Sequence, residues 1–274
     1  MTPFAVDTDP FQLALVLIAS VIGGAVNAIA GGGTLLTFPA LVGLGIPALV
    51  ANATSTVALW PGTVASIWGY RDLLVGMQSW VKWFAIPSVL GGLVGAVLLL
   101  ETPASRFDII VPWLVFGATV LFVIQKPLAE RIARRDNAHR SPEAADDHTA
   151  DRAVSPSIKL LVYQFGVAVY GGYFGAGIGI LMLASLGCLG LTDIHEMNAV
   201  KTVLSSIINQ VAAAYFIFAG LIDWPKALVM TTGALAGYFL GAHYSQRFPQ
   251  RRVRQIITGI GLLISAVMFY KQFG

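Results

Sequence analysis

The strongest constraint on the fold is a long stretch without charge, because Phe11 to Tyr70 contains no Asp, Glu, Lys, Arg or His. A helix needs about 20 apolar residues to span a bilayer, whereas no soluble core requires so long an uncharged run. The whole chain is 56% hydrophobic and only 11% charged, against about 25% charged residues in an average soluble domain. Its mean hydropathy is +0.75. The sequence therefore predicts an all-α membrane protein.

Apolar stretches continue along the chain and predict about ten helical segments, making eight to ten crossings. The first five are expected at 11–30, 34–50, 52–69, 83–100 and 107–125, and the second five at 159–176, 178–192, 198–221, 226–245 and 254–271. A charged stretch, Lys126 to Arg152, separates the two sets, and a helical start is expected at Pro127 to Arg135. The expected organisation is a first transmembrane repeat at 1–125, a cytoplasmic linker at 126–158 and a second transmembrane repeat at 159–274.

The two sets of segments repeat each other at a constant offset, without a gap, over about eighty residues. Matching positions include Ala30-Gly31-x-Gly33 with Ala176-Gly177-x-Gly179, Asn52-Ala53-x-x-Thr56 with Asn198-Ala199-x-x-Thr202, and Gly91-x-x-x-Gly95 with Gly237-x-x-x-Gly241. Duplicated helix sets with a broken helix in each half are typical of secondary transporters. The Gly-x-x-x-Gly pairs are expected to be helix-packing faces.

Basic residues predict the orientation, because Lys and Arg concentrate on the cytoplasmic side of inner-membrane proteins. If the N-terminus is outside and every segment crosses, 14 of the 17 Lys and Arg residues lie inside. We therefore expect a multi-pass protein of the bacterial inner (plasma) membrane, with both termini outside. An odd number of segments in each set makes the repeats inverted. The segments 34–50 and 178–192 are short, so each is either a crossing or half of a re-entrant hairpin, and the inversion holds in both cases.

Two glycine breaks are the leading candidates for a binding site. The first comprises Gly31, Gly32, Gly33 and Thr34, and the second contains Gly175, Gly177 and Gly179. Glycine permits positive φ angles and exposes successive N–H groups, and the helix that follows directs its positive end at the break. Such a break binds an anion without a charged side chain. A tight hairpin or a close helix contact is the alternative explanation.

Polar residues inside the spans extend the candidate substrate site. Asn27 precedes the first break, Asn52 and Thr56 follow it, and Asn198, Lys201 and Asn209 follow the second break. Lys201, Ser205 and Asn209 share one helix face, because they are four residues apart. Lys201 either neutralises an anion or extends to the inner headgroups. Asn52 and Asn198 bind substrate or cap their helices.

Several classes of function lack their required residues. No Asp or Glu lies deep in a span, as a proton or cation pathway usually requires, and no titratable cluster is present for catalysis. The single Cys188 offers neither a disulfide framework nor metal-ligand spacing. We therefore expect no enzyme activity, catalytic residues, metal or cofactor. The basic residues are explained by topology, so no nucleic-acid partner is expected.

The residues around the breaks resemble those of the TauE/SafE sulfite exporter family. The resemblance rests on Gly23 to Leu41 followed by Ala51-Asn52-Ala53-Thr54-Ser55-Thr56, and on Gly175-Ala176-Gly177-Ile178-Gly179 followed by Asn198-Ala199-Val200-Lys201. It implies an inner-membrane permease for small sulfur-containing anions such as sulfite or sulfoacetate, often moved outward. Tyr173 stands where the first repeat has Asn27, so a symmetric pair of Asn ligands is absent.

The predicted function is therefore secondary transport, with export of sulfite, sulfoacetate or a related organosulfonate driven by the membrane potential. A passive anion channel and a membrane-embedded enzyme acting on a lipid-linked substrate are the alternatives. The expected partners are the anion and the lipid bilayer, and both a monomer and a homodimer are compatible with the sequence.

Overall fold

The computed structural model describes residues 9–30, 32–139, 156–188, 191, 194–244 and 250–273. Within these ranges the secondary structure is entirely helical, as the sequence predicts. The helices are α1 (Pro10–Ala30), α2 (Thr34–Gly43), α3 (Ala48–Gly69), α4 (Arg71–Leu74), α5 (Gln78–Glu101), α6 (Ala104–His139), α7 (Ile158–Tyr173), α8 (Ile178–Cys188), α9 (Ile194–Phe218), α10 (Trp224–Tyr244) and α11 (Gln250–Phe273). Each of the ten expected segments overlaps one of them, and only the four-residue α4 was not expected.

Five helices are long and apolar enough to cross a membrane: Pro10–Ala28, Gln78–Glu101, Ala104–Ile124, His195–Phe218 and Gln255–Gln272. The helices α2 and α8 are much shorter, with 10 and 11 residues. At 1.5 Å per residue they reach only about 15–17 Å, roughly half of the hydrocarbon core. Within the described residues neither is long enough to cross the core by itself, and each packs against the helix before its glycine break.

Two expected boundaries are wrong for a local reason. The segment predicted at 34–50 is divided, because Gly45 has a φ of +84° and Pro47 caps α3. Glycine tolerates this left-handed turn, and proline suits the start of the next helix. The end of the segment predicted at 107–125 is also displaced, since α6 continues to His139 and includes the helical start predicted at Pro127 to Arg135. The linker residues 140–155 lie outside the described ranges.

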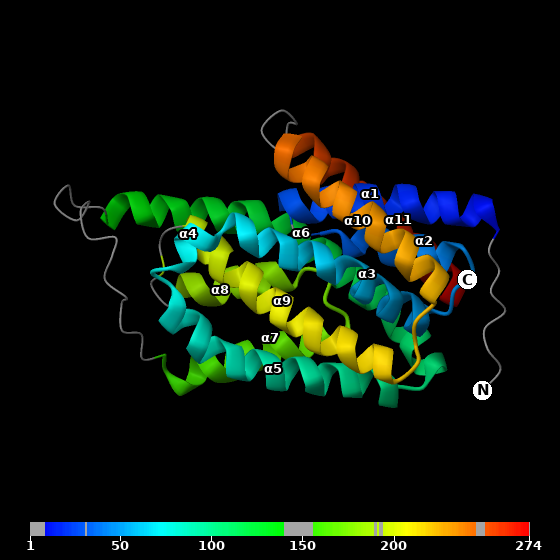
Figure 1. The fold of residues 1–274 in the computed structure, drawn as a ribbon, viewed down its shortest axis with the longest axis horizontal. Helices are drawn as coiled ribbons and strands as arrows, with labels where there is room; N and C mark the ends of the chain where they lie inside the picture. The colour runs from blue at the N-terminus through cyan, green and yellow to red at the C-terminus, as the bar shows by residue number, and fades with distance from the viewer. Residues whose placement is uncertain are drawn as a thin grey trace.

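The two ends of the bundle contain different helix ends and turns (Figure 1). The Pro10 end of α1 and the Phe273 end of α11 lie on the right, together with the turn between α5 and α6. The C-terminal end of α6 and the start of α7 lie on the left. The described ends of the chain thus lie opposite the helix ends that flank the linker.

Close packing joins helices from opposite halves of the chain. On α10, a Cβ added at Gly237 or Gly241 would overlap the backbone of Val21 or Ala25 on α1. On α5, a Cβ at Gly91 or Gly95 would overlap the backbone of α7. The predicted role of both Gly-x-x-x-Gly pairs as packing faces is confirmed, because only glycine permits these backbones to approach so closely.

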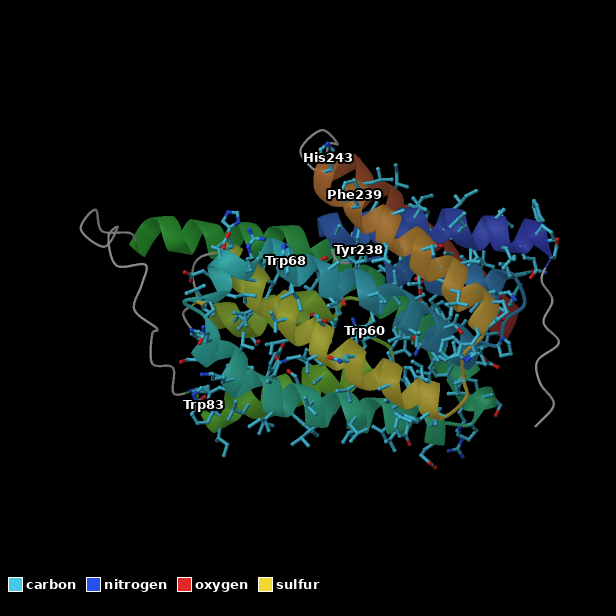
Figure 2. The ribbon with its side chains drawn as sticks, viewed as in Figure 1. Trp60, Trp68, Trp83, Tyr238, Phe239 and His243 are labelled. Atoms are coloured by element: carbon cyan, nitrogen blue, oxygen red, sulfur yellow. The ribbon has the colours of Figure 1, made fainter. Side chains whose placement is uncertain are left out.

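The bundle is apolar outside as well as inside. Large side chains are exposed on outward faces, among them Trp68 at 74% and Phe239 at 72%. Figure 2 shows Trp83 and Phe239 near the outline of the molecule, whereas Trp60 lies towards its centre. Soluble monomers rarely expose so much contiguous apolar surface, and a lipid-facing surface requires it.

Candidate functional site

The second glycine break is an open, irregular connection between α7 and α8. Gly175 and Gly177 have φ angles of +77° and +78°, which favour glycine. The Tyr170 hydroxyl donates to the carbonyl oxygen of Ala176 at 2.6 Å and holds the break in shape. The N–H groups of Ala176, Gly177 and Gly179 have no hydrogen-bond partner among the described residues. The break therefore presents unused donors at the N-terminal end of α8.

Lys201 of α9 lies across this end of α8. A Cβ at Gly179 would lie 3.1 Å from the Lys201 Cδ, so the absence of a side chain at Gly179 leaves room for the lysine stem. The ammonium donates to Asn198 Oδ1 at 2.7 Å. Among the residues that the structure describes, no carboxylate pairs with Lys201. Its two remaining ammonium donors have no protein acceptor there.

The predicted polar face of α9 is confirmed. Four residues after Lys201, the Ser205 hydroxyl lies 3.3 Å from Met182 Sδ of α8. Four residues further, Asn209 Oδ1 lies 3.8 Å from the position of a Cβ at Gly175. The face of α9 with i, i+4, i+8 spacing therefore lies against both α8 and the break that precedes it.

The electrostatics of this region favour an anion. The N-terminal end of α8 carries the positive end of the helix dipole, and the Lys201 ammonium adds a full positive charge beside it. The two repel each other unless a negative group lies between them. Unused N–H groups at such a terminus are the usual donors to phosphate, sulfate or carboxylate groups.

The first glycine break is constructed differently, because its polar groups bond to one another. Gly33 donates its N–H to Asn27 Oδ1 at 3.1 Å, and the Asn27 amide donates in turn to the Tyr238 hydroxyl of α10. The expectation of a positive φ is wrong at Gly33, where φ is −58°. Glycine is required there by packing, since a Cβ would lie 2.5 Å from the Gly23 oxygen. Gly31 lies outside the described residues.

The start of α3 connects the two breaks. Asn52 donates its amide to the carbonyl oxygen of Tyr173, where the second break begins, at 3.0 Å. One turn further, the Ser55 hydroxyl lies 2.6 Å from that of Thr37 on α2. Thr34, the first residue of α2, is partly buried.

The alternative prediction that Asn52 and Asn198 cap their helices is wrong. The N-cap of α3 is Pro47, and α9 begins at Ile194, so Asn52 and Asn198 both lie four residues inside their helices. The local geometry around the two residues repeats nevertheless. The Thr56 hydroxyl donates to the Asn52 carbonyl, and the Thr202 hydroxyl donates to the Asn198 carbonyl.

Both breaks meet the same stretch of α6. A Cβ at Gly32 would overlap the Phe122 ring, and a Cβ at Gly177 would contact Leu121 at 3.5 Å. The rings of Phe38 on α2 and Phe174 in the second break are in edge contact, with centroids 5.4 Å apart. The two breaks thus lie close together in the interior, where irregular backbone is tolerated in membrane proteins.

Comparison with known proteins identifies the family of this chain. The family model described as sulfite exporter TauE/SafE matches residues 16–268. This chain belongs to the TauE/SafE family. A probable membrane transporter protein of Haemophilus influenzae is 27% identical over 95% of this chain and 95% of its own length. The probable membrane transporter protein YfcA of Escherichia coli K12 is 27% identical over 96% and 90%, and YunE of Bacillus subtilis is 22% identical over 94% and 97%. No solved structure matches the chain.

The resemblance noted in the sequence is thus confirmed, and this TauE/SafE protein is a multi-pass membrane transporter. Its relatives are named as transporters, which agrees with the expectation of a non-enzyme. In the described part of the chain, no group of three His, Cys, Asp or Glu side chains could hold a metal ion.

Two further polar features of this TauE/SafE transporter are not among the site residues predicted from its sequence. Lys226 and Asp223 form an ion pair of 2.9 Å at the start of α10, with only 5% and 15% of their side chains exposed. Trp60 of α3 has a buried indole N–H without a partner among the described residues. In the sequence, Trp60 could have been noticed as a hydrogen-bonding side chain inside an apolar span. The ion pair could have been noticed as opposite charges three residues apart.

Proposed function

We propose that the protein is a secondary transporter that exports small sulfur-containing anions across the bacterial inner membrane, with sulfite, sulfoacetate or a related organosulfonate as substrate. The observation that carries the proposal is Lys201, a lysine inside a membrane helix without a carboxylate partner among the described residues. A cation at membrane depth is unfavourable unless it is paired, so a mobile anion is its natural partner.

The anion lies, in this proposal, between Lys201 and the first turn of α8. The N–H groups of Gly177 and Gly179 donate to its oxygens, and the ammonium supplies charge. Asn209, at the other end of the polar face of α9, borders the site near Gly175. A small tetrahedral or pyramidal oxyanion suits these donors, because several of its oxygens accept hydrogen bonds at once.

We further propose that residues 1–125 and 159–274 are inverted repeats. Support comes from two equivalent contacts between the halves. Helix α1 of the first half packs against α10 of the second, and their counterparts in the other half, α7 and α5, pack against each other in the same way. The two glycine breaks meet in the interior, as expected when two broken helices form one central site. Rocking of one repeat against the other would then expose the site to alternate sides.

The distribution of basic residues supports a cytoplasmic linker at 126–158 and both termini outside. Export under this orientation needs no bound proton, because an interior-negative potential already favours outward movement of an anion. The names of the relatives, which are probable membrane transporters, favour transport over an enzyme that acts on a lipid-linked substrate.

Flux of labelled sulfite, sulfoacetate, thiosulfate and sulfate into proteoliposomes tests the proposal. We expect saturable flux of at least one sulfur-containing anion above that of protein-free vesicles, which report the leak of protonated sulfite. Vesicles containing the Lys201→Met variant are the matched control, because methionine keeps the length of the stem without its charge. Absence of protein-dependent flux for all four anions would overturn the proposal, and flux without saturation would identify a passive channel.

A further inference from the structure

One buried hydrogen-bond acceptor at the junction of the two breaks lacks a partner. Asn52 is only 1% exposed, and its Oδ1 has no hydrogen bond with any described residue. Its amide orientation is determined by the Tyr173 carbonyl, which accepts from Nδ2 at 3.0 Å. Exchanging the two amide atoms would place two carbonyl oxygens against each other. Oδ1 is therefore the atom left without a donor.

The matching residue of the second half shows what such an oxygen normally receives. Asn198 Oδ1 accepts from Lys201, three residues later on α9. Three residues after Asn52 stands Ser55, whose short hydroxyl is already engaged by Thr37. The first half thus has the same acceptor but, among its described residues, no donor for it, and a buried acceptor without a donor is unfavourable.

The position of this oxygen relates it to the proposed anion site. Asn52 contacts the break at Tyr173, and Lys201 contacts the same short connection at Gly179. One end of the break is therefore bordered by an unpaired acceptor, and the other by an ammonium group and unused N–H groups. A ligand that fits both ends is negative on one side and carries a hydrogen-bond donor on the other.

We infer that Asn52 selects anions that carry a hydrogen-bond donor, so that hydrogen sulfite is preferred over an anion of equal charge and size without one. The inference rests on the proposed function. The hydroxyl of hydrogen sulfite donates to Asn52 Oδ1, while its other oxygens face Lys201 and the N–H groups of α8. Methanesulfinate places a methyl group at the same point and leaves Oδ1 unpaired. A site that provides a polar group for a substrate hydroxyl discriminates strongly against the analogue that lacks it.

Hydrogen sulfite and methanesulfinate provide the test, because replacing the hydroxyl of HO–SO2− by methyl gives CH3–SO2−, a pyramidal anion of the same charge and similar size. Both labelled anions are offered to proteoliposomes at one slightly acidic pH, where hydrogen sulfite is the main form of sulfite. Leak is subtracted with protein-free vesicles. We expect the wild-type protein to prefer hydrogen sulfite on the order of tenfold or more in flux at low concentration. We expect Asn52→Leu to reduce the ratio of hydrogen sulfite flux to methanesulfinate flux to near one.

Thr63→Val is the control on the same helix, since the Thr63 hydroxyl only bonds back to the Trp60 carbonyl. Thr63→Val should keep the wild-type ratio of the two anion fluxes. Equal flux of the two anions in the wild-type protein overturns the role of Asn52 without the need for a variant, and so does an unchanged ratio in Asn52→Leu. Neither result affects the proposed function, which fails only if no anion shows protein-dependent flux.

Discussion

Asp223 and Lys226 form a buried ion pair of 2.9 Å at the first turn of α10. Asp223 also caps this helix, because its Oδ1 accepts from the Lys226 N–H at 3.3 Å. Its own N–H donates to the Thr54 hydroxyl of α3 at 3.1 Å. The pair therefore connects the start of α10 to the helix that carries Asn52.

Removal of one partner of this pair should destabilise the protein strongly. We expect Lys226→Met to cost about 3–5 kcal/mol, because it leaves the Asp223 carboxylate buried without a counter-ion. The double variant Asp223→Asn with Lys226→Met should cost less than this single change, since Asn retains the cap and carries no charge. Unfolding in detergent, followed by tryptophan fluorescence, measures the difference. A double variant no more stable than Lys226→Met would contradict the importance of the pair.

The overall arrangement could be predicted because it depends on local sequence. Uncharged runs such as Phe11 to Tyr70 determine the spans, and glycine breaks determine where α1 and α7 end. The turn at Gly45 was missed, because a single glycine in an apolar run does not reveal its φ angle. Short helices inside a longer apolar stretch are therefore the weakest part of such a prediction.

The candidate site was predictable only in its local features. The spacing of Lys201, Ser205 and Asn209 determines a helix face, whatever that face contacts. The bond between Asn52 and the Tyr173 carbonyl depends on how α3 packs against a helix from the other half, which no local pattern encodes. The same limit applies to the contact between Asn27 and Tyr238.

The two glycine breaks should respond differently to asparagine. Valine should abolish transport at both Gly33 and Gly177. Asparagine tolerates a positive φ better than other residues, and a Cβ at Gly177 meets nothing closer than 3.5 Å. Gly177→Asn should therefore retain much more flux than Gly177→Val. Gly33→Asn should lose as much as Gly33→Val, since any Cβ meets the Gly23 oxygen at 2.5 Å.

The effect of each substitution is measured as flux per assembled transporter and as the Tm of the protein in detergent. Gly117→Ala of α6 is the control, because a Cβ there meets no atom within 4 Å. It should be neutral or slightly stabilising, as alanine favours a helix by about 1 kcal/mol over glycine. Equal tolerance of asparagine at Gly33 and Gly177 would show that clash and backbone angle do not distinguish the breaks.

Loss of the Lys201 charge should weaken anion binding. We expect Lys201→Met to cost about 1–3 kcal/mol of binding free energy, the usual range for a hydrogen bond to a charged group. This corresponds to an increase of about 5- to 150-fold in the half-saturating concentration. Lys159→Met, at the exposed start of α7, should leave that concentration unchanged. An unchanged affinity in Lys201→Met would mean that this lysine only extends to the inner headgroups.

Single cysteines should report the orientation. On a Cys188→Ser background, Ala104→Cys marks the turn between α5 and α6, and Ser157→Cys marks the residue before α7; both positions are exposed and lie at opposite ends of the bundle. We expect an impermeant maleimide to label Ala104→Cys on intact cells, and Ser157→Cys only after permeabilisation. The reverse pattern would refute the orientation proposed from the basic residues.

The driving force should be the membrane potential. In the described spans Lys201 has no acidic partner to carry a proton, and export requires none. Moving one negative charge outward is favourable by about 2.3 kcal/mol per 100 mV, or roughly a fifty-fold concentration ratio. We expect flux in proteoliposomes to follow a potassium/valinomycin potential at equal pH on both sides. Flux that ignores this potential but follows an imposed pH gradient, after correction for leak of the protonated acid, would instead indicate proton coupling. His195, Glu196 and Asp223, which lie near the ends of their helices, would then be the first residues to replace.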